Sequence, residues 1–436
     1  MTLLLALAAA RLTCPLRRPR RGGGASFSLS DAGPPQGGEL STHRLISKTM
    51  LPILVFVGAL VAVGTAVLIP GPIGAFSVAM RTHELTDSNR RDPYSPYNSS
   101  SRRRILVSVF LPLDPVRHAD ARVQQLPYMP PLTAEEYGKQ AAAIAPALKD
   151  VFSLLSIEYR RLETTAHPCG DYVGKTSSYP VVIFSPGLSG SRMMYAAGAR
   201  DLASQGYVVI TIDHPYDASI VEFPDGTVIR GINITTPADI LHAVMVRAAD
   251  VTFLINQLHD NVGLEHLTAG FSGVVDVEKM AIYGHSLGGA TAAEVMLKDN
   301  RLLGGMNWDG QMQGDSANEG LVRPFVQLGV PGHRHMNGSN WAAFYRLLRG
   351  PKLELEVAGT THSSFTDLPL LLSTTVVPPA YRPAVEQVLG TVNGRLLRRT
   401  LTGILKASLD FVFGKDAEGV ERLTDDYFGV SVVEDR

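Results

Sequence analysis

Short apolar runs alternate with longer amphipathic stretches along most of the chain after Pro70. The apolar runs are rich in β-branched and aromatic residues and end at Gly, Pro or Asp, which is typical of buried strands. They begin at Ile105, Val181, Val208, Lys279, Leu302, Pro324 and Lys352. The stretches with helical spacing begin at Ala141, Arg192, Ile240, Gly288 and Ser339. This alternation predicts the α/β class, with a mostly parallel sheet that helices cover on both faces.

Residues 50–69 read MLPILVFVGALVAVGTAVLI and carry no charge. Twenty uncharged residues are enough to span a bilayer as a helix. The same segment can also be the apolar part of a signal peptide that is cleaved after Ala66. We therefore predict a membrane-targeting segment, either cleaved or retained as a transmembrane anchor. Residues 1–49 are rich in Arg, Gly and Pro and are predicted to be disordered, and residues 76–436 are predicted to form one catalytic domain.

Charge and cysteine content narrow the possible partners. The formal net charge is −1, so no basic surface indicates nucleic-acid binding. The two cysteines, Cys14 and Cys169, cannot build a disulfide framework or a thiolate metal site, and Cys169 is expected to be a lone thiol in a loop. Three glycosylation sequons, at Asn98, Asn233 and Asn337, fit a secreted or lumenal domain.

The stretch AIYGHSLGGATAAE contains a candidate nucleophile, Ser286, in a G-x-S-x-G pattern. The five letters alone are a weak signal, but residues 280–283 read as a strand and residues 289–298 as a helix. A serine on such a strand-to-helix turn sits on a strained backbone that exposes its hydroxyl. The amide of Leu287 opens the helix and is a natural donor to an oxyanion.

A nucleophilic serine needs a histidine base, and three histidines follow Ser286 in the chain. His362 lies in the loop TTHSSF, directly after the predicted strand KLELEVAG, where a sheet-end loop can present an imidazole to the serine. His333 and His335 lie together in PGHRHMNG, without a nearby Cys or carboxylate, so a loop or substrate-channel role is favoured over a metal site. We predict that His362 is the base.

The acid that orients the histidine is found by elimination. Residues 320–353 contain no Asp or Glu, so the position after the strand PFVQLGV has no acid. Asp309 ends the strand LLGGMNW and projects from the edge of the sheet, and we predict it as the acid. The other candidates are Glu294, Asp299, Asp315 and Glu319. A second oxyanion donor is predicted at Leu188, in the turn after the strand VVIFSPG.

At these residues the chain resembles the calcium-independent, plasma-type platelet-activating factor acetylhydrolases and their fungal relatives. The motifs that carry the resemblance are GHSLGGAT, the D-x-x-M segment from Asp309 to Met312, and H-x-x-F-x-D from His362 to Asp367. The resemblance implies an α/β-hydrolase fold, a triad of Ser286, Asp309 and His362, and oxyanion donors at Leu188 and Leu287. It also implies a phospholipid substrate with a short or oxidised sn-2 acyl group. Pro186 departs from the family's usual histidine at that position.

The expected reaction is ester hydrolysis through an acyl-serine, which requires no metal and no organic cofactor. One alternative is a cutinase-like or general carboxylesterase on the same fold. Another alternative, from a different class, is an inactive membrane-tethered binding protein. The run LPLLLSTTVVPPAY, from Leu368, can contact a membrane or lipid surface or can be a core segment, and the sequence leaves both open.

Overall fold

The computed structural model describes residues 66–95, 100–116, 118, 121–162, 177–416 and 418–434. Residues 1–65 lie outside this part, and with them Cys14 and all but the last four residues of the predicted targeting segment. Asn98 and Cys169 also lie outside the described residues.

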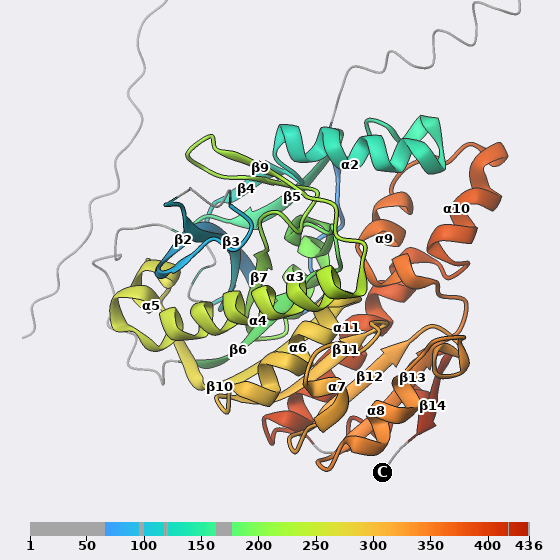
Figure 1. Cartoon of the computed structure of the whole chain (residues 1–436). Coiled ribbons are helices and arrows are strands. Elements are labelled where there is room, and N and C mark those ends of the chain that lie inside the picture. Colours follow the sequence, from blue (N-terminus) through green and yellow to red (C-terminus); the bar gives the residue numbers. More distant parts are fainter. Residues whose placement is uncertain are drawn as a thin grey trace, which may run out of the picture. The chain divides into compact units, whose positions relative to one another are not determined.

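The described part of the chain is built around a nine-stranded sheet with the order β14-β13-β12-β11-β10-β6-β7-β3-β2 (Figure 1). The strands from β13 to β7 in this order are parallel, and β14, β3 and β2 are antiparallel to their neighbours. The bounds are β2 (Ser77–Arg91), β3 (Arg102–Leu113), β6 (Ser178–Ser185), β7 (Val208–Asp213), β10 (Val274–His285), β11 (Leu302–Trp308), β12 (Phe325–Gly329), β13 (Lys352–Val357) and β14 (Val430–Glu434). The predicted α/β class and mostly parallel sheet are confirmed.

Helices cover both faces of the sheet, as predicted (Figure 1). They are α2 (Pro131–Ile144), α3 (Ala196–Ala203), α4 (Pro237–His259), α5 (Asn261–Thr268), α6 (Leu287–Lys298), α7 (Ser316–Glu319), α8 (Trp341–Leu347), α9 (Leu368–Leu372), α10 (Arg382–Leu389), α11 (Gly394–Val412) and α12 (Leu423–Asp426). Residues of α4, α6 and α8 share one apolar core, and residues of α3, α9 and α11 share another.

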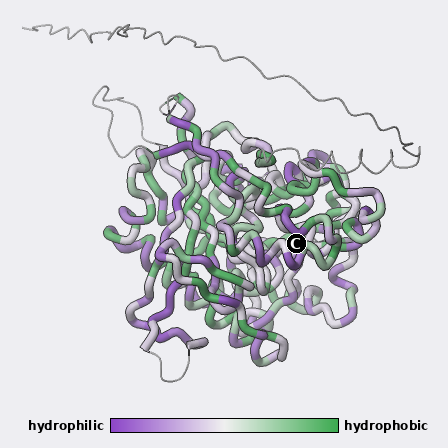
Figure 2. Tube along the Cα trace, turned by 90° about the horizontal axis from the view of Figure 1, so that it is seen from above, coloured by the Kyte–Doolittle hydropathy of each residue, from purple (hydrophilic) through white to green (hydrophobic). Residues whose placement is uncertain are grey.

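Alternate residues of the central strands supply the two cores, because successive side chains of a strand point to opposite faces. In β6, Val181 and Ile183 enter the core with α4 and α6, and Val182 and Phe184 enter the core with α3 and α11. In Figure 2, which colours the described residues by hydropathy, hydrophobic stretches run through the body of the fold and hydrophilic ones are frequent at its periphery. The continuous apolar runs in the sequence therefore mark strands that are buried on both faces.

Two smaller sheets flank the main one. The first has the order β1-β5-β4, from β1 (Val67–Leu68), β5 (Leu155–Arg160) and β4 (Val123–Pro127), and the second pairs β8 (Ile220–Glu222) with β9 (Val228–Arg230). The fold thus includes residues before Phe76, since Val67 and Leu68 pair with β5 and Ile69 is buried. None of the helices in the described residues is long and apolar enough to cross a membrane.

The helix expected from Ala141 to Tyr159 is largely wrong. Helix α2 ends at Ile144, a short 3-10 turn covers Pro146–Leu148, and the chain then enters strand β5. Pro146 explains the break, because its ring clashes with the preceding turn and it has no amide to donate. Ile157 and Tyr159 alternate with more polar residues along β5, which is strand periodicity inside a stretch that reads as helical.

Helix α4 covers most of the stretch predicted to be helical from Ile240, but it begins three residues earlier, at Pro237. Thr236 and Asp239 form a capping box at its start, and Pro237 occupies the first turn, where no amide bond is lost. The predicted apolar face is buried except for its first residue, Ile240. Arg247 and Asp250 are also buried on this helix, so α4 delivers two charged side chains to the interior.

Candidate active site

Ser286 lies on the turn between strand β10 and helix α6, as the sequence predicts. Its backbone has φ 55° and ψ −124°, and residues other than glycine rarely adopt a positive φ. Its amide donates to the carbonyl of Trp308 at 2.8 Å, which ties the turn to the end of strand β11. Strain of this kind persists only where the surroundings enforce it, and it often marks functional sites.

The two glycines of the G-x-S-x-G pattern are required by close backbone contact. A Cβ on Gly284 would lie 2.1 Å from the carbonyl oxygen of Gly288. A Cβ on Gly288 would lie 2.0 Å from the carbonyl oxygen of Ser185, in strand β6. Real Cβ atoms cannot approach backbone so closely, so both positions need glycine for the turn to close.

Asp309 and His362 are hydrogen-bonded, with the Nδ1 of His362 donating to Asp309 Oδ2 at 2.6 Å. Asp309 follows β11 directly and adopts φ 54°, a second left-handed residue in the site. His362 begins a short 3-10 turn (His362–Phe365) after strand β13, and its side chain is 53% exposed. With Nδ1 on Asp309, Nε2 is the ring nitrogen that remains to accept a proton.

His333 is a second histidine in contact with Asp309, which the sequence does not reveal. Its Nδ1 donates to the other oxygen of Asp309, Oδ1, at 2.7 Å, and its ring stacks on Trp341 with centroids 4.0 Å apart. The amide of Val330 donates to the same Oδ1 at 3.0 Å. Burial opposes ionisation of Asp309, but the bonds from His333, His362 and Val330 hold its pKa well below the usual range. The sequence favours a loop or substrate-channel role for His333 and does not predict this direct contact with Asp309.

A buried chain of hydrogen bonds joins the turn after β6 to the loop of His362. The amide of Gly187 donates to the hydroxyl of Tyr195 at 3.3 Å, and that hydroxyl donates to Nδ1 of His285 at 2.8 Å. Nε2 of His285 then donates to the carbonyl of His362 at 3.0 Å. Burial, together with nearby His362, lowers the pKa of His285 to about 3, so this imidazole is neutral and keeps both bonds near neutral pH.

The predicted oxyanion donors lie on two turns that meet at Ser286. Leu287 is the first residue of α6, so its amide has no acceptor within the helix. Leu188 lies in the turn after β6, directly behind Gly187. A Cβ on Gly187 would lie 3.2 Å from the Cβ of Ser286, which shows how closely the two turns approach.

Three of the four other candidate acids have side-chain contacts elsewhere in the fold. Glu294 accepts from the amide of Ser316 and pairs with Lys298, which also pairs with Asp315, and Asp299 pairs with Arg301. Within the described residues, no cluster of three or more His, Cys, Asp or Glu side chains could hold a metal ion.

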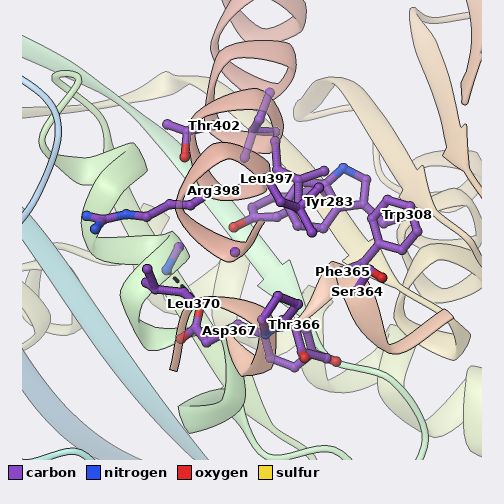
Figure 3. Close-up of a pocket in the computed structure, with 16 residues that line it drawn as sticks. Tyr283, Trp308, Ser364, Phe365, Thr366, Asp367, Leu370, Leu397, Arg398 and Thr402 are labelled. Carbon is purple, nitrogen blue, oxygen red and sulfur yellow. Dashed lines mark hydrogen bonds between the residues drawn. The ribbon is translucent and has the colours of Figure 1, made fainter. Parts of the chain in front are cut away.

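Asp367 has a supporting place in the fold. It is buried in the wall of a cavity of about 40 Å³ between helix α11 and the sheet (Figure 3). It accepts hydrogen bonds from the amides of Ala197 and Gly198 in α3 and from the hydroxyl of Tyr128. Burial raises its pKa to about 6 despite these bonds. The loop that begins with His362 is thereby fixed to α3.

A second Ser–His–Asp arrangement lies inside the protein. Ser185 Oγ lies 3.0 Å from Nε2 of His214, and Nδ1 of His214 donates to Asp250 Oδ2 at 2.9 Å. All three residues are at most 1% exposed. Arg103 donates to both carboxylate oxygens of Asp250. Ser185 belongs to the regular strand β6, and no surface gives a substrate access to its hydroxyl.

The sequence matches the family model of platelet-activating factor acetylhydrolase, isoform II, over residues 97–223 and 246–379, which is more than half of the chain. A probable 1-alkyl-2-acetylglycerophosphocholine esterase from Arthroderma benhamiae is 29% identical over 407 residues, covering 87% of this chain and 96% of that protein. A platelet-activating factor acetylhydrolase from Bos taurus is 26% identical over 230 residues, covering 43% of this chain and 48% of its own length.

Among solved structures, a ferulic acid esterase from Streptomyces cinnamoneus is similar with a TM-score of 0.66 and 26% sequence identity. The match covers 85% of this chain and all of that one. The fold described above is therefore also the fold of an esterase, and the matched family segments contain every residue of the candidate triad.

Proposed function

The chain belongs to the platelet-activating factor acetylhydrolase family, isoform II, and from this premise we propose that it is a serine esterase that cleaves short or oxidised sn-2 acyl esters of phospholipids. Its relatives are carboxylic ester hydrolases by name. The observation that carries the proposal is the 2.6 Å bond between Asp309 and His362 at the same edge of the sheet as the strained Ser286. A histidine held in this way can act as a general base.

In the proposed reaction, Nε2 of His362 removes the proton from Ser286 as its Oγ attacks the ester carbonyl. The amides of Leu188 and Leu287 stabilise the oxyanion, and Asp309 holds the imidazole in the tautomer that carries its proton on Nδ1. The protonated His362 then gives its proton to the leaving alcohol. A water molecule, activated by the same imidazole, hydrolyses the acyl-serine and releases the carboxylic acid.

An apolar cavity of about 140 Å³ beside the loop of His362 supports a short acyl group. Its wall comes from α2, α9 and α10 and includes Ser363, Met194, Ala141, Ile144, Leu368 and Val388. A dry apolar cavity of about 150 Å³ holds a benzene molecule. A cavity of this size therefore suits an acyl chain of a few carbons better than a full-length fatty acid.

The similarity to a ferulic acid esterase favours a second candidate, a more general carboxylesterase whose acyl site accepts an aromatic group. The same cavity has room for one ring. The two candidates differ in the alcohol that they require, since only the first needs a glycerophospholipid.

The location of the reaction is also a proposal. We infer a domain in the secretory lumen or outside the cell, secreted or membrane-anchored, that meets its substrate at a membrane or lipid surface. The exposed sequons at Asn233 and Asn337 support the first part, and Val376, which is 94% exposed in the run from Leu368, supports the second. Digestion with a peptide N-glycosidase would shift the mass of a glycosylated chain, and co-sedimentation with phosphatidylcholine vesicles would test the lipid contact.

The test of the proposed function uses the full chain, because residues 67–69 are part of the fold. Hydrolysis would be followed for phosphatidylcholines that differ only in their sn-2 group, from acetyl to oleoyl, and for methyl ferulate and p-nitrophenyl acetate, all with EDTA. Turnover of the acetyl phospholipid that falls with chain length and is lost in Ser286→Ala is expected. Turnover of the simple esters without any phospholipid hydrolysis would replace the proposal with the second candidate.

A further inference from the structure

The turn after strand β6 is held by side chains on both sides of Leu188. The amide of Gly187 donates to the hydroxyl of Tyr195, and the amide of Ser189 donates to Asp217 Oδ1 at 3.3 Å. Ser189 adopts φ 62°, which is strained for a residue with a side chain. Among the described residues, nothing accepts a hydrogen bond from the amide of Leu188. The turn therefore keeps a single backbone donor available at the side of Ser286.

Arg247 of helix α4 is hydrogen-bonded to the backbone of this turn. Its guanidinium is 1% exposed and donates from Nη1 to the carbonyl of Pro186 at 2.5 Å and from Nη2 to the carbonyl of Gly187 at 3.0 Å. Nε donates to Asp217 Oδ2 at 2.8 Å, so the same carboxylate binds Arg247 and the amide of Ser189. Helix α4 packs beside α6, the helix that begins at the nucleophile (Figure 1).

The planarity of the peptide bond determines where the amide of Leu188 points. A trans peptide is planar, and its C=O and N–H point in opposite directions. The carbonyl of Gly187 accepts from Arg247 and, at 3.0 Å, from the amide of Gly190, so the amide of Leu188 in the same peptide points away from both donors. Gly187 lies beside Ser286, since a Cβ on Gly187 would lie 3.2 Å from the Cβ of that serine.

We propose that Arg247 is a positioning residue that preforms the oxyanion hole by fixing the Gly187–Leu188 peptide with its N–H toward Ser286. The inference rests on the proposed function, since an oxyanion forms only if Ser286 attacks an ester. A donor that is already oriented needs no rearrangement when charge develops, which is where most of its catalytic benefit arises.

The alternative is that Arg247 and Asp217 form a buried ion pair that only supports the fold. Buried ion pairs stabilise proteins weakly, and apolar side chains of similar size often do as well. Donation to backbone carbonyls also occurs at Arg200, so what distinguishes Arg247 is the place: its two acceptors are the successive carbonyls that precede Leu188. What the guanidinium adds at this place is a fixed fork of donors, which apolar side chains cannot supply.

The test compares Arg247→Lys and the charge-balanced double variant Arg247→Met/Asp217→Asn with a matched control, Arg200→Lys. Arg200 is also fully buried and also donates to two backbone carbonyls, those of Pro70 and Glu158, but it does not touch the turn after β6. Active sites are counted with a phosphonate that reacts with Ser286, so that unfolded protein does not contribute to kcat. The inhibition constant of a trifluoromethyl ketone, which forms an oxyanion on the serine, is measured for each protein.

The double variant is expected to lose about 100-fold in kcat per titrated serine, the typical effect of losing one oxyanion donor, with little change in KM. Arg247→Lys should lie between it and the wild type. The inhibition constant of the ketone should rise in proportion to the loss of kcat/KM, and Arg200→Lys should keep the wild-type values. A kcat per titrated serine that stays at the wild-type level in both Arg247 variants would overturn the proposal.

A second measurement needs no variant. Crystal structures of the free wild-type protein and of its phosphonate adduct should show the same orientation of the Gly187–Leu188 peptide. A peptide that flips on adduct formation would show that the hole is not preformed and would overturn the role of Arg247. Wild-type protein that hydrolyses no ester at all would instead contradict the proposed function, so the two failures are distinguishable.

Discussion

The described part of the protein contains two Ser–His–Asp arrangements, and the contrast between them shows what hydrogen bonding alone does not provide. In the core, Ser185, His214 and Asp250 form an unbroken chain of hydrogen bonds with no exposed surface. At the sheet edge, His362 binds Asp309 and is 53% exposed. Connectivity would favour the buried set, but a substrate carbonyl must reach the serine, and only the edge arrangement has the exposure for that.

The two arrangements also differ in the backbone conformation of the serine and in the charges around the aspartate. Ser286 has a left-handed φ on a turn, whereas Ser185 continues a regular strand. Asp250 is neutralised by Arg103, so its charge serves the fold, whereas the two oxygens of Asp309 are each bound by a histidine. Burial lowers the pKa of His214, which keeps that imidazole neutral. The buried set therefore reads as a support for the turn after β6, and the edge set as the catalytic site.

The largest expected difference is between the two serines. Ser286→Ala should reduce kcat by a factor of at least about 10⁴, since removing the nucleophile of a serine hydrolase costs about 10⁶. Ser185→Ala should leave most of the activity, because its hydroxyl contacts only His214 within the core. Both variants would be assayed on acetyl phosphatidylcholine after their folding is checked by circular dichroism. Comparable losses of kcat in both variants would contradict the proposed difference between the two serines.

Substitution of Asp309 is expected to lower activity, and substitution of Asp250 is expected to lower stability. Asp309→Asn should fold normally and lose about 10⁴-fold in kcat, because an amide favours the wrong tautomer of His362. Asp250→Asn should lose about 3–5 kcal/mol of stability, since it leaves the buried Arg103 without its main charge partner. Urea unfolding and steady-state kinetics on both variants measure the split. An Asp309→Asn protein with nearly full kcat would show that another carboxylate is the acid.

His333 should have an intermediate effect on the edge site. His333→Phe keeps a ring to stack on Trp341 but removes the donor to Asp309, and we expect a loss of about tenfold in kcat, as for a hydrogen bond to a charged group. Without that donor the pKa of Asp309 rises toward its unfolded value, so Asp309 contributes less stability near neutral pH and that contribution is lost at a higher pH on acidification. His333→Asn, which can still donate, should restore part of both. If kcat and the pH dependence of the free energy of unfolding are unchanged in His333→Phe, the role of His333 is limited to packing.

The smallest effect concerns the buried histidine. His214 has a lowered pKa in the folded protein, so below about pH 6.5 the unfolded chain binds a proton that the folded chain does not. Stability is therefore expected to fall as the pH drops below that value. His214→Gln should reduce the slope by at most about 1.4 kcal/mol per pH unit. Thermal unfolding between pH 7 and pH 5 tests this, and an identical slope in the variant would indicate that His214 does not titrate on unfolding.

The sequence predicts the central sheet and the turn at Ser286 because both depend on local patterns. Strands buried on both faces give continuous apolar runs, and the close approaches of Gly284 and Gly288 make glycine necessary at those positions. Asp309 is predicted by eliminating the other acids, and it is hydrogen-bonded to His362 in the structure. The oxyanion roles of Leu188 and Leu287 stay predictions until they are measured.

The features that the sequence does not reveal depend on contacts between distant elements. His333 meets Asp309 only because its loop is stacked on Trp341, and nothing in PGHRHMNG indicates that path. His214 and Asp250 come from different elements, so their contact with Ser185 has no local signature. The helix that was expected to continue after Ala141 ends before Pro146. The proline is a local signal for this break, but the apolar spacing of the stretch favoured a helix in the prediction.

The most direct test of the central claim is to label the full-length protein with a fluorophosphonate and map the modified peptide by mass spectrometry. The phosphonate reacts only with a serine that is both activated and accessible. Modification of Ser286, blocked by prior incubation with acetyl phosphatidylcholine, is the predicted result, with Ser185 unmodified. Label on Ser185, or none on Ser286 in protein that hydrolyses esters, would contradict the assignment of the edge arrangement as the catalytic site.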